Sequence, residues 1–289
     1  MKIAIQGIKG SFHHIAANEF FGENISLHEC MSFDEIPELI KKNIVDGAVM
    51  AIENSITGSI LPNYLLIDSF NLNVHGEIHL PLINNLMALP GQHLKDIKEV
   101  WSDPMAIQNC QPFFNTHPEI RIIEENDITH VAKRIRDKKL LGVATIANKK
   151  AAEIYGLEIL ENEIQADSSD TTRYFILKKN RHHHPEDYLN NKALLKLVTG
   201  NEIGSLENIL TILSKHNLNI AKIQFIPIVE KSWAYAIFMD LIFDNYIEYC
   251  KALLIIEKKV KELKILGEYH ENNIFFNQLN SIQILNKTG

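Results

Sequence analysis

The chain has 289 residues, a length that suits two or three domains better than one. Its hydrophobic fraction of 46% is ordinary for a globular protein with a buried core. The net charge of −7 at pH 7 disfavours nucleic acid and anionic membranes as partners of the whole chain. The three cysteines are too far apart to predict a disulfide framework, and no run approaches the ~18 apolar residues of a membrane span. Since no apolar leader follows Met1, we expect a soluble, cytoplasmic protein.

The N-terminal half alternates between strand-like and helix-like segments. Residues 2–7 predict a strand, and Ser11 is placed to cap a helix over residues 13–21. Ser32 and Glu35 form the capping-box pattern at the start of another helix. The alternation continues with strand 46–52, strand 97–101, a helix ending at Phe114, and residues 120–123, 128–138, 141–146 and 149–155. This order predicts a parallel or mixed sheet with helices on its faces, whose ligands bind beyond the carboxyl ends of the strands.

Polar side chains gather at these strand ends. They are Ser11, Glu53, Asn54, Ser55 and Ser102. The most informative segment, residues 170–177, places the hydroxyl of Thr172 and the guanidinium of Arg173 where an apolar strand begins. A guanidinium is always charged and matches a carboxylate bidentately, so we expect a neutral proton donor beside a fixed cation. Taken alone, a Thr-Arg pair also fits a strand that merely opens on an exposed charge.

A polar stretch at residues 180–191 divides the chain, and we expect it to be a linker. Its histidines, His182 to His184, have no companion ligand at a fixed spacing, which favours a solvated linker over a metal site. The segments that follow are strand 193–198, helix 205–216, strand 219–228, strand 233–243, helix 246–260 and strand 262–269. This βαββαβ order predicts a ferredoxin-like domain over 192–270, after a first domain over 1–179 and before a polar tail at 271–289.

Other chemical motifs do not compete with this interpretation. Residues 7–11 lack the spacing of a dinucleotide-binding loop and the Gly-Lys-Ser of a P-loop. The sequence contains neither a G-x-S-x-G nucleophile elbow nor an H-E-x-x-H metal motif. His13 and His14 fall in a first helical turn and Cys110 falls in an amphipathic helix, where structural roles are at least as well supported as catalytic ones.

Six blocks of the sequence, in order, resemble one family. The blocks are residues 7–17, 52–59, 102–106, 172–174, 204–206 and 222–227. Each block alone is weak, but together they make the chain similar to bacterial prephenate dehydratases that carry a C-terminal ACT regulatory domain. The resemblance extends from Met1 to about Tyr269. It implies an α/β fold with a two-lobed catalytic domain, like that of periplasmic binding proteins, followed by a ferredoxin-like ACT domain.

The resemblance also implies a reaction, the decarboxylative dehydration of prephenate to phenylpyruvate in phenylalanine biosynthesis. Formation of the aromatic ring drives it, so no metal or organic cofactor is expected. Thr172 would donate a hydrogen bond to the departing hydroxyl, and Arg173 would anchor a substrate carboxylate. Glu53 could be an acid, an orienting group or a structural carboxylate, and the sequence leaves these three roles open. The remaining candidates are Ser55 as a catalytic residue and Asn54, Ser102, Ser11 and Thr171 as substrate-binding residues.

An ACT domain would add feedback by phenylalanine and assembly into a homodimer or homotetramer. The effector-binding candidates are Gly204, Ser205, Leu206, Gln224 and Pro227. Phe225 and Ile226 stand where the family's motif has a small hydroxyl and a guanidinium, and Gln224 stands in place of its carboxylate. We therefore expect phenylalanine to bind more weakly than in relatives with the full motif.

Four residues depart from the family's usual pattern. Asp103 and Asn85 replace frequent histidines, Asp170 replaces asparagine, and Ala166 replaces a frequent aspartate. We expect Asp170 to pair with Arg173 in the empty enzyme, so that Asp170→Asn lowers KM or raises activity. Two alternatives stay open, an arogenate dehydratase and a catalytically weak homologue that senses an amino acid. A solute-binding protein is disfavoured by the missing leader and the second domain.

Overall fold

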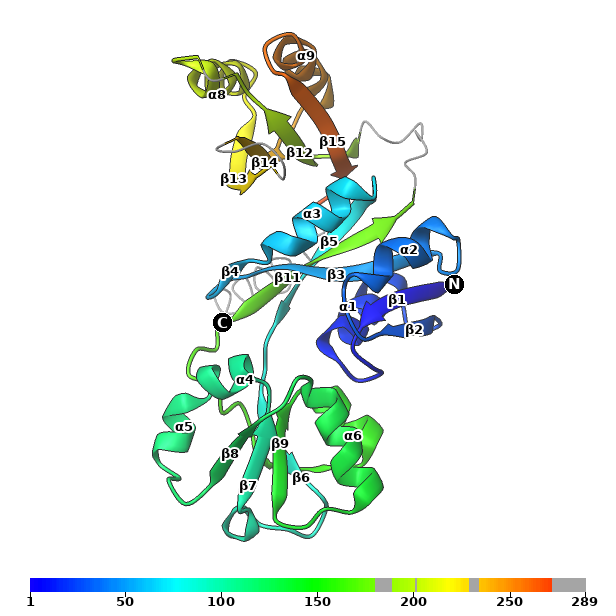
Figure 1. Cartoon of the computed structure of the whole chain (residues 1–289), viewed down its shortest axis with the longest axis vertical. Helices are drawn as coiled ribbons and strands as arrows, with labels where there is room; N and C mark the ends of the chain where they lie inside the picture. Colours follow the sequence, from blue (N-terminus) through cyan, green and yellow to red (C-terminus); the bar gives the residue numbers. More distant parts are fainter. Residues whose placement is uncertain (180–188, 201, 229–233, 272–289) are drawn as a thin grey trace, which may run out of the picture. The chain divides into compact units, whose positions relative to one another are not determined.

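The computed structural model describes residues 1–179, 189–200, 202–228 and 234–271, so the three linker histidines and the polar tail after 271 lie outside it. The chain forms two compact units (Figure 1). Unit 1 comprises residues 1–60 and 78–174, and unit 2 comprises residues 61–77 and the described residues from 175 onward. The chain passes between the units at residues 60–61 and again within two strands, β5 (Asn73–Pro81) and β11 (Thr171–Lys178).

The first lobe of unit 1 is built on a sheet with parallel central strands, which fits the predicted parallel or mixed sheet. Strand β1 (Lys2–Gln6) pairs in parallel with β2 (Ser26–Cys30) and with β3 (Gly47–Asn54). β11 follows β3 in the hydrogen-bonded order, and the short β4 (Gly58–Ser59) is antiparallel to β3. Helices α1 (Phe12–Phe21) and α2 (Glu35–Lys41) connect the strands. The core strand β3 is buried over almost its whole length, which is typical of a strand covered on both faces.

The second lobe holds a five-stranded mixed sheet in the order β10-β6-β9-β7-β8. Its strands are β6 (Asn85–Ala88), β7 (Glu99–Ser102), β8 (Arg121–Glu124), β9 (Val143–Ala147) and β10 (Glu158–Glu161). A short 3-10 helix (Leu94–Asp96) precedes β7, and the α-helices are α4 (Pro104–Asn109), α5 (Gln111–Asn115), α6 (Ile128–Lys138) and α7 (Lys149–Tyr155).

Each face of this sheet has its own apolar core. Val143 and Ala147 of β9 pack with α6 and α7, whereas Ala144 and Ile146 pack with α4 and α5. Alternate residues of one strand thus fill two cores, as the side-chain period of two requires. Figure 1 shows α5 and α6 on opposite sides of the sheet.

Two local predictions need correction. The helix expected to end at Phe114 is two helices that break at Cys110, with proline in the first turn of each. Helix α2 begins at Glu35 after the N-cap Asp34, so Ser32 is not its cap. Half of the predicted capping box does form, because the Glu35 carboxylate accepts a hydrogen bond from the Ser32 backbone N–H at 3.0 Å.

Unit 2 shows the predicted βαββαβ order. Its elements are β12 (Lys192–Val198), α8 (Ser205–Lys215), β13 (Asn219–Pro227), β14 (Tyr235–Ile242), α9 (Tyr246–Glu257) and β15 (Glu262–Tyr269), joined by α3 (Leu61–Ser69) from the earlier part of the chain. The antiparallel sheet order is β13-β14-β12-β15, and both α8 and α9 contribute to its core. None of the described helices is long and apolar enough to cross a bilayer.

Within unit 2, strand β15 also pairs with β5, at Gly267 and Val74. A Cβ on Gly267 would lie 2.3 Å from the Val74 carbonyl oxygen, so only glycine fits there. A buried ion pair supports the same junction. The Lys192 ammonium donates to Glu77 Oε1 at 2.5 Å, and the Tyr269 hydroxyl donates to Glu77 Oε2 at 3.0 Å. Glu77 is 1% exposed and Lys192 is 4% exposed, so both charges need partners, and the Lys192 ammonium also contacts Glu271 Oε1 at 2.8 Å.

Candidate active site in unit 1

A cavity of about 420 Å³ opens in unit 1 where several strands and loops end. Its volume falls within the roughly 300–1,000 Å³ of small-molecule sites. The position agrees with the prediction that a ligand binds beyond the carboxyl ends of the strands. The polar residues that line it are Gln6, Ser11, His13, Asn54, Thr57, Asp103, Asn126, Asp127, Thr129, Thr172 and Tyr174. Three of the eight predicted catalytic and substrate-binding residues, Ser11, Asn54 and Thr172, are therefore among the lining residues.

Thr172 and Tyr174 form a hydroxyl pair on the cavity side of β11. Because side chains alternate along a strand, residues 172 and 174 lie on the same face. Their side chains are hydrogen-bonded to each other, and the Asn54 amide donates to Thr172 Oγ1 at 3.2 Å. Burial raises the pKa of Tyr174 far above its usual range, so its phenol stays protonated. The pair thus presents neutral O–H groups to the cavity.

Asn54 holds this region together through both ends of its side-chain amide. Its oxygen accepts from the backbone N–H groups of Ile56, at 3.0 Å, and Thr57, at 2.9 Å. Its nitrogen donates to Thr172 and to Asp170 Oδ1, the latter at 2.5 Å. The other Asp170 oxygen accepts from the Asn109 amide at 2.7 Å. Asp170 is only 2% exposed, so these two amides replace the water that would otherwise solvate the carboxylate.

The proton donor and the cation that were predicted to lie together, Thr172 and Arg173, lie on opposite faces of β11. Arg173 is not among the described residues that line the cavity. It is 6% exposed, and its guanidinium lies 3.7 Å from Glu53 Oε2. Glu53 is likewise absent from the lining residues. Arg173 forms an ion pair with Glu53. The Asp170 carboxylate accepts hydrogen bonds from the side-chain amides of Asn54 and Asn109. These contacts differ from the predicted pair between Asp170 and Arg173.

Ser55, Thr171 and Ser102 have surroundings that differ from those predicted. Ser55 and Thr171 join the end of β3 to the start of β11, because each backbone N–H bonds to the other residue at 2.9 Å. In one of these bonds Thr171 donates to the Ser55 hydroxyl, and in the other Ser55 donates to the Thr171 carbonyl. Ser102 is 0% exposed, and its hydroxyl has no hydrogen-bond partner among the described residues. Ser55, Thr171 and Ser102 are not among the described residues that line the cavity.

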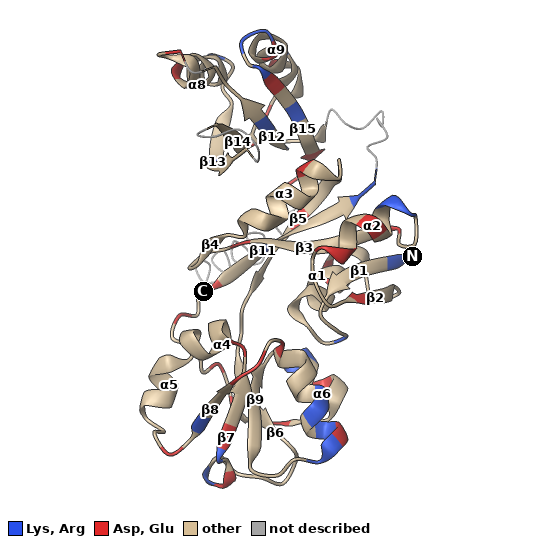
Figure 2. Cartoon of the chain, in the orientation of Figure 1, with Lys and Arg blue, Asp and Glu red and all other residues tan. Residues whose placement is uncertain are grey.

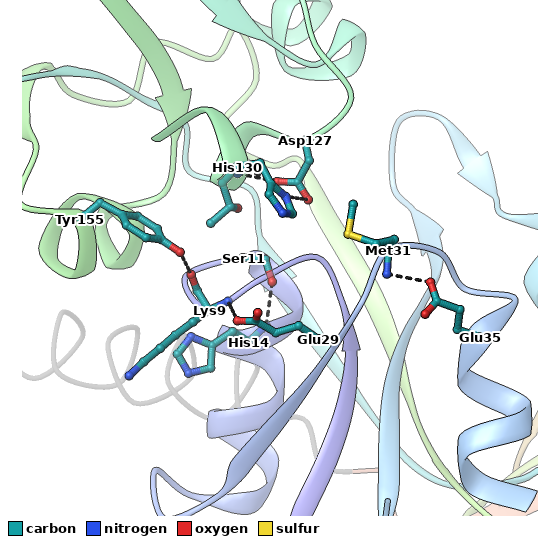
Figure 3. A network of polar contacts seen from close by, with 10 residues as sticks. Lys9, Ser11, His14, Glu29, Met31, Glu35, Asp127, His130 and Tyr155 are labelled. Atoms are coloured by element: carbon teal, nitrogen blue, oxygen red, sulfur yellow. Dashed lines mark hydrogen bonds and ion pairs between the residues drawn. The ribbon is translucent and has the colours of Figure 1, made fainter. Parts of the chain in front are cut away.

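The loop at residues 7–11 is fixed against the second lobe (Figure 3). The Tyr155 hydroxyl donates to the Lys9 carbonyl at 2.5 Å, and the Asn148 amide donates to the Gly10 carbonyl at 2.8 Å. Gly10 has φ +101°, a left-handed conformation that favours glycine. These contacts position Ser11, which is the N-cap of α1 as predicted and accepts the His14 N–H at 3.3 Å.

The charged side chains recorded around the cavity are both aspartates. Asp103 and Asp127 are the N-caps of α4 and α6, and each accepts two backbone N–H groups of its own helix. Burial raises the pKa of Asp103, and the negative charge of Asp127 adds to the effect, against the lowering by the backbone hydrogen bonds. Asp103 was predicted only as a departure from the family's pattern, and Asp127 was not predicted as a site residue. A polar residue between strand 120–123 and helix 128–138 was the available signal for Asp127.

His13 also lines the cavity, but it acts as a neutral acceptor. Its Nε2 accepts the Ala51 backbone N–H at 3.3 Å. Burial lowers its pKa to about 4, against a weak opposing effect of Asp127, so the ring is uncharged near neutral pH. Among the described residues, no three His, Cys, Asp or Glu side chains come close enough to form a metal-binding group.

The predicted effector residues lie on two elements of unit 2. Gly204 is the N-cap of α8 with φ +84°, and Leu206 packs on the core of this unit. The Ser205 hydroxyl donates to the Glu202 carbonyl at 2.8 Å. Gln224 and Pro227 belong to β13, the edge strand of the sheet. A cavity of about 560 Å³ in this unit is lined instead by residues of α9 and β15.

Known proteins match the chain over most of its length. The family model described as prephenate dehydratase matches residues 3–182. A bifunctional chorismate mutase/prephenate dehydratase of Enterobacter agglomerans is 28% identical over 277 residues, which is 94% of this chain and 71% of that protein. The arogenate dehydratase/prephenate dehydratase 2 of Arabidopsis thaliana is 35% identical over 181 residues, which is 62% of this chain and 46% of that protein.

Solved structures share the fold at low sequence identity. A prephenate dehydratase from Arthrobacter aurescens in complex with L-Phe has a TM-score of 0.81 at 18% identity, over all of both chains. GqqA, described as a quorum-quenching acylase, has a TM-score of 0.85 at 22% identity and covers 95% of this chain and 99% of its own. At these identities the likeness establishes the fold and leaves the chemistry to the residues of the site.

Proposed function

The chain belongs to the prephenate dehydratase family, and from that premise we propose that the cavity of unit 1 is where water and CO₂ are removed from prephenate. In this reaction the bond to the ring carboxylate breaks and its electron pair enters the ring. The C–O bond at the opposite ring carbon then breaks, and the hydroxide leaves as water once it has a proton. The enzyme therefore has to hold an anion and assist a departing hydroxyl.

The observation that carries this proposal is the hydroxyl pair of Thr172 and Tyr174 in the cavity. The Asn54 amide occupies an acceptor position of Thr172 Oγ1, which leaves the Thr172 proton for another acceptor. Thr172 is too weak an acid to release its proton freely, so it would donate a hydrogen bond while the hydroxide leaves, with Tyr174 behind it in a relay. Both groups remain neutral and add no charge next to an anionic substrate.

The start of α1 is the part of the cavity best suited to a substrate carboxylate. Ser11, Phe12 and His13 all line the cavity, and α1 is a helix of 10 residues. The N-terminus of a helix carries a partial positive charge and unpaired N–H groups, which favour anions. Arg173, buried with Glu53 behind β11, would act as a positioning residue that fixes the strand rather than as the direct carboxylate anchor expected from sequence.

For unit 2 we propose an ACT-type regulatory role with phenylalanine as effector. The βαββαβ order, the left-handed Gly204 before α8 and the L-Phe named for the Arthrobacter aurescens structure support this proposal. The edge strand β13 would pair with a second copy in a homodimer or homotetramer. Gln224, Phe225 and Ile226 do not restore the charged motif of the family, so binding would be weak.

Two measurements test this function. The first follows prephenate and phenylpyruvate by NMR with the parent, Thr172→Ala and the control Thr116→Ala, whose hydroxyl bonds to Phe113 and His117 away from the cavity lining. We expect turnover by the parent and the control, and a folded but nearly inactive Thr172→Ala. Equal rates for all three would remove Thr172 from the reaction, and an inactive folded parent would refute prephenate as the substrate.

The second measurement is a calorimetric titration with phenylalanine. Binding in the micromolar to millimolar range is expected for a weakened effector site. Submicromolar binding would contradict the weakened site, and no heat at millimolar ligand would mean that unit 2 has no phenylalanine site and serves only in assembly.

A further inference from the structure

The charge of the cavity is opposite to what a purely anionic substrate requires. Among the described residues that line it, the charged ones are Asp103 and Asp127, both acidic. Figure 2 shows acidic residues on the loops after β7 and β8, while Lys and Arg residues of this lobe lie on α6, on β8 and near the start of β7. Arg173 is on the other face of β11, next to Glu53. A dianion entering this cavity would meet two carboxylates at close range.

Oδ1 of Asp103 caps α4 by accepting the N–H of Met105 at 2.9 Å and that of Ala106 at 3.0 Å. The carboxylate also accepts a hydrogen bond from the backbone N–H of Asp103 itself, and no side chain donates to it among the described residues. Asp127 uses Oδ1 in the same way, and its Oδ2 lies 3.4 Å from His130 Nδ1. Burial raises the pKa of Asp103 and the nearby charge of Asp127 adds to the effect, so backbone hydrogen bonds compensate its negative charge only in part. A cation from a ligand would supply that compensation, and another anion would worsen the imbalance.

We propose that Asp103, with Asp127 beside it, makes this cavity prefer arogenate, whose side chain carries a 2-ammonium group, over prephenate, whose side chain carries a 2-oxo group. The two compounds share the ring carboxylate and the ring hydroxyl. They differ only at this side-chain position, so the preference depends on what faces it. This inference rests on the proposed function, because it assumes that the same cavity performs the dehydration.

The reaction balances in the same way for the ammonium substrate. The bond to the ring carboxylate breaks to release CO₂, the ring C–O bond breaks, and the hydroxide leaves as water with one proton from the site. No oxidant or reductant takes part. The ammonium group keeps its nitrogen and its protons throughout, so the product is phenylalanine, and Asp103 would bind this group without exchanging a proton with it.

Asp103→Asn isolates the charge from the fold. Asparagine caps helices about as well as aspartate does, so α4 keeps its start while the carboxylate becomes neutral. The matched control is Asp96→Asn, which makes the same change of charge on an exposed residue of the 3-10 helix before β7. The measurement is kcat/KM for arogenate and for prephenate with the parent and both variants, at one pH and ionic strength, with circular dichroism to verify folding.

We expect the parent to have the higher kcat/KM for arogenate. Asp103→Asn should lower the arogenate-to-prephenate ratio by about tenfold or more, equivalent to about 1.4 kcal/mol of discrimination. Asp96→Asn should leave the ratio unchanged. A parent that prefers prephenate, or an Asp103→Asn ratio within about twofold of the parent's, would overturn the inference while leaving the dehydratase function intact. If the folded parent converted neither compound, the proposed function itself would fall, and the inference with it.

Discussion

Replacing Asp170 by asparagine separates two accounts of the site. If its carboxylate repels an anionic substrate or competes for Arg173, Asp170→Asn should improve binding. The structure instead shows the carboxylate accepting hydrogen bonds from Asn54 at 2.5 Å and from Asn109 at 2.7 Å. An asparagine offers only one oxygen, so its own NH₂ group would face one of these two amides. We therefore expect Asp170→Asn to be harmful.

The size of the effect follows from burial. A buried donor left without an acceptor costs roughly 1–3 kcal/mol, and the remaining bond loses its ionic character, worth roughly a further 1 kcal/mol. Removing a buried carboxylate offsets part of this cost, because its desolvation penalty also disappears. A net loss of about 2 kcal/mol in the free energy of unfolding is expected. Since the same Asn54 amide orients Thr172, a misplacement there should also lower kcat by about tenfold.

A swap provides the control. In the double variant Asp170→Asn/Asn109→Asp, the new asparagine can accept from Asn54 and donate to the new aspartate, which restores both hydrogen bonds. Asn109→Asp alone would place two carboxylates face to face and should be the least stable of the three. Urea unfolding and steady-state kinetics on prephenate measure both effects. An unchanged unfolding midpoint together with a lower KM for Asp170→Asn would show that the carboxylate repels substrate and that this reasoning is wrong.

Three further outcomes are expected. Thr172→Ala should lower kcat by about 10²-fold or more with little change in KM, measured by initial rates; a loss confined to KM would argue against a role in the chemical step. The pKa of His13 is about 4 in the folded protein and 6.5 in the unfolded chain, so the unfolded chain takes up this proton at a higher pH than the folded protein does. Stability should therefore decline between about pH 6.5 and pH 4 by roughly 3 kcal/mol, and His13→Gln should show a smaller decline in urea titrations at both pH values. Gly267→Ala should shift the thermal midpoint of unfolding downward, because its Cβ would overlap the Val74 carbonyl; an unchanged midpoint would mean that β15 and β5 separate freely.

Local rules predicted much of the fold. The cap at Ser11, the parallel strands of the first lobe and the βαββαβ order all follow from short-range patterns, and the structure confirms them. The helix break at Cys110 was harder to predict from the sequence, because each half of that segment is helical by itself. Only the prolines near the two helix starts indicate separate helices.

The site was predictable only in part. Of the residues selected by the rule that ligands bind at strand ends, Ser11, Asn54 and Thr172 line the cavity. Strand alternation also requires Thr172 and Arg173 to lie on opposite faces, although the sequence does not say which face meets the cavity. The hydrogen bonds of Asp170 join it to residues 116 and 61 positions away, and no local pattern reports a contact of that range.

The path of β5 bears on whether residues 1–179 could fold without the rest of the chain. One end of this strand carries Val74 and Glu77, which pair with Gly267 and Lys192. Just past its other end, the Leu82 N–H donates to the Asp170 carbonyl at 2.8 Å, beside the site. Ending the chain at residue 179 would remove Lys192 and Gly267, which contact Glu77 and Val74, while the half of β5 next to the site remained. Loss of the C-terminal segment would therefore require compensating changes at Val74 and Glu77, within the same strand that reaches the site.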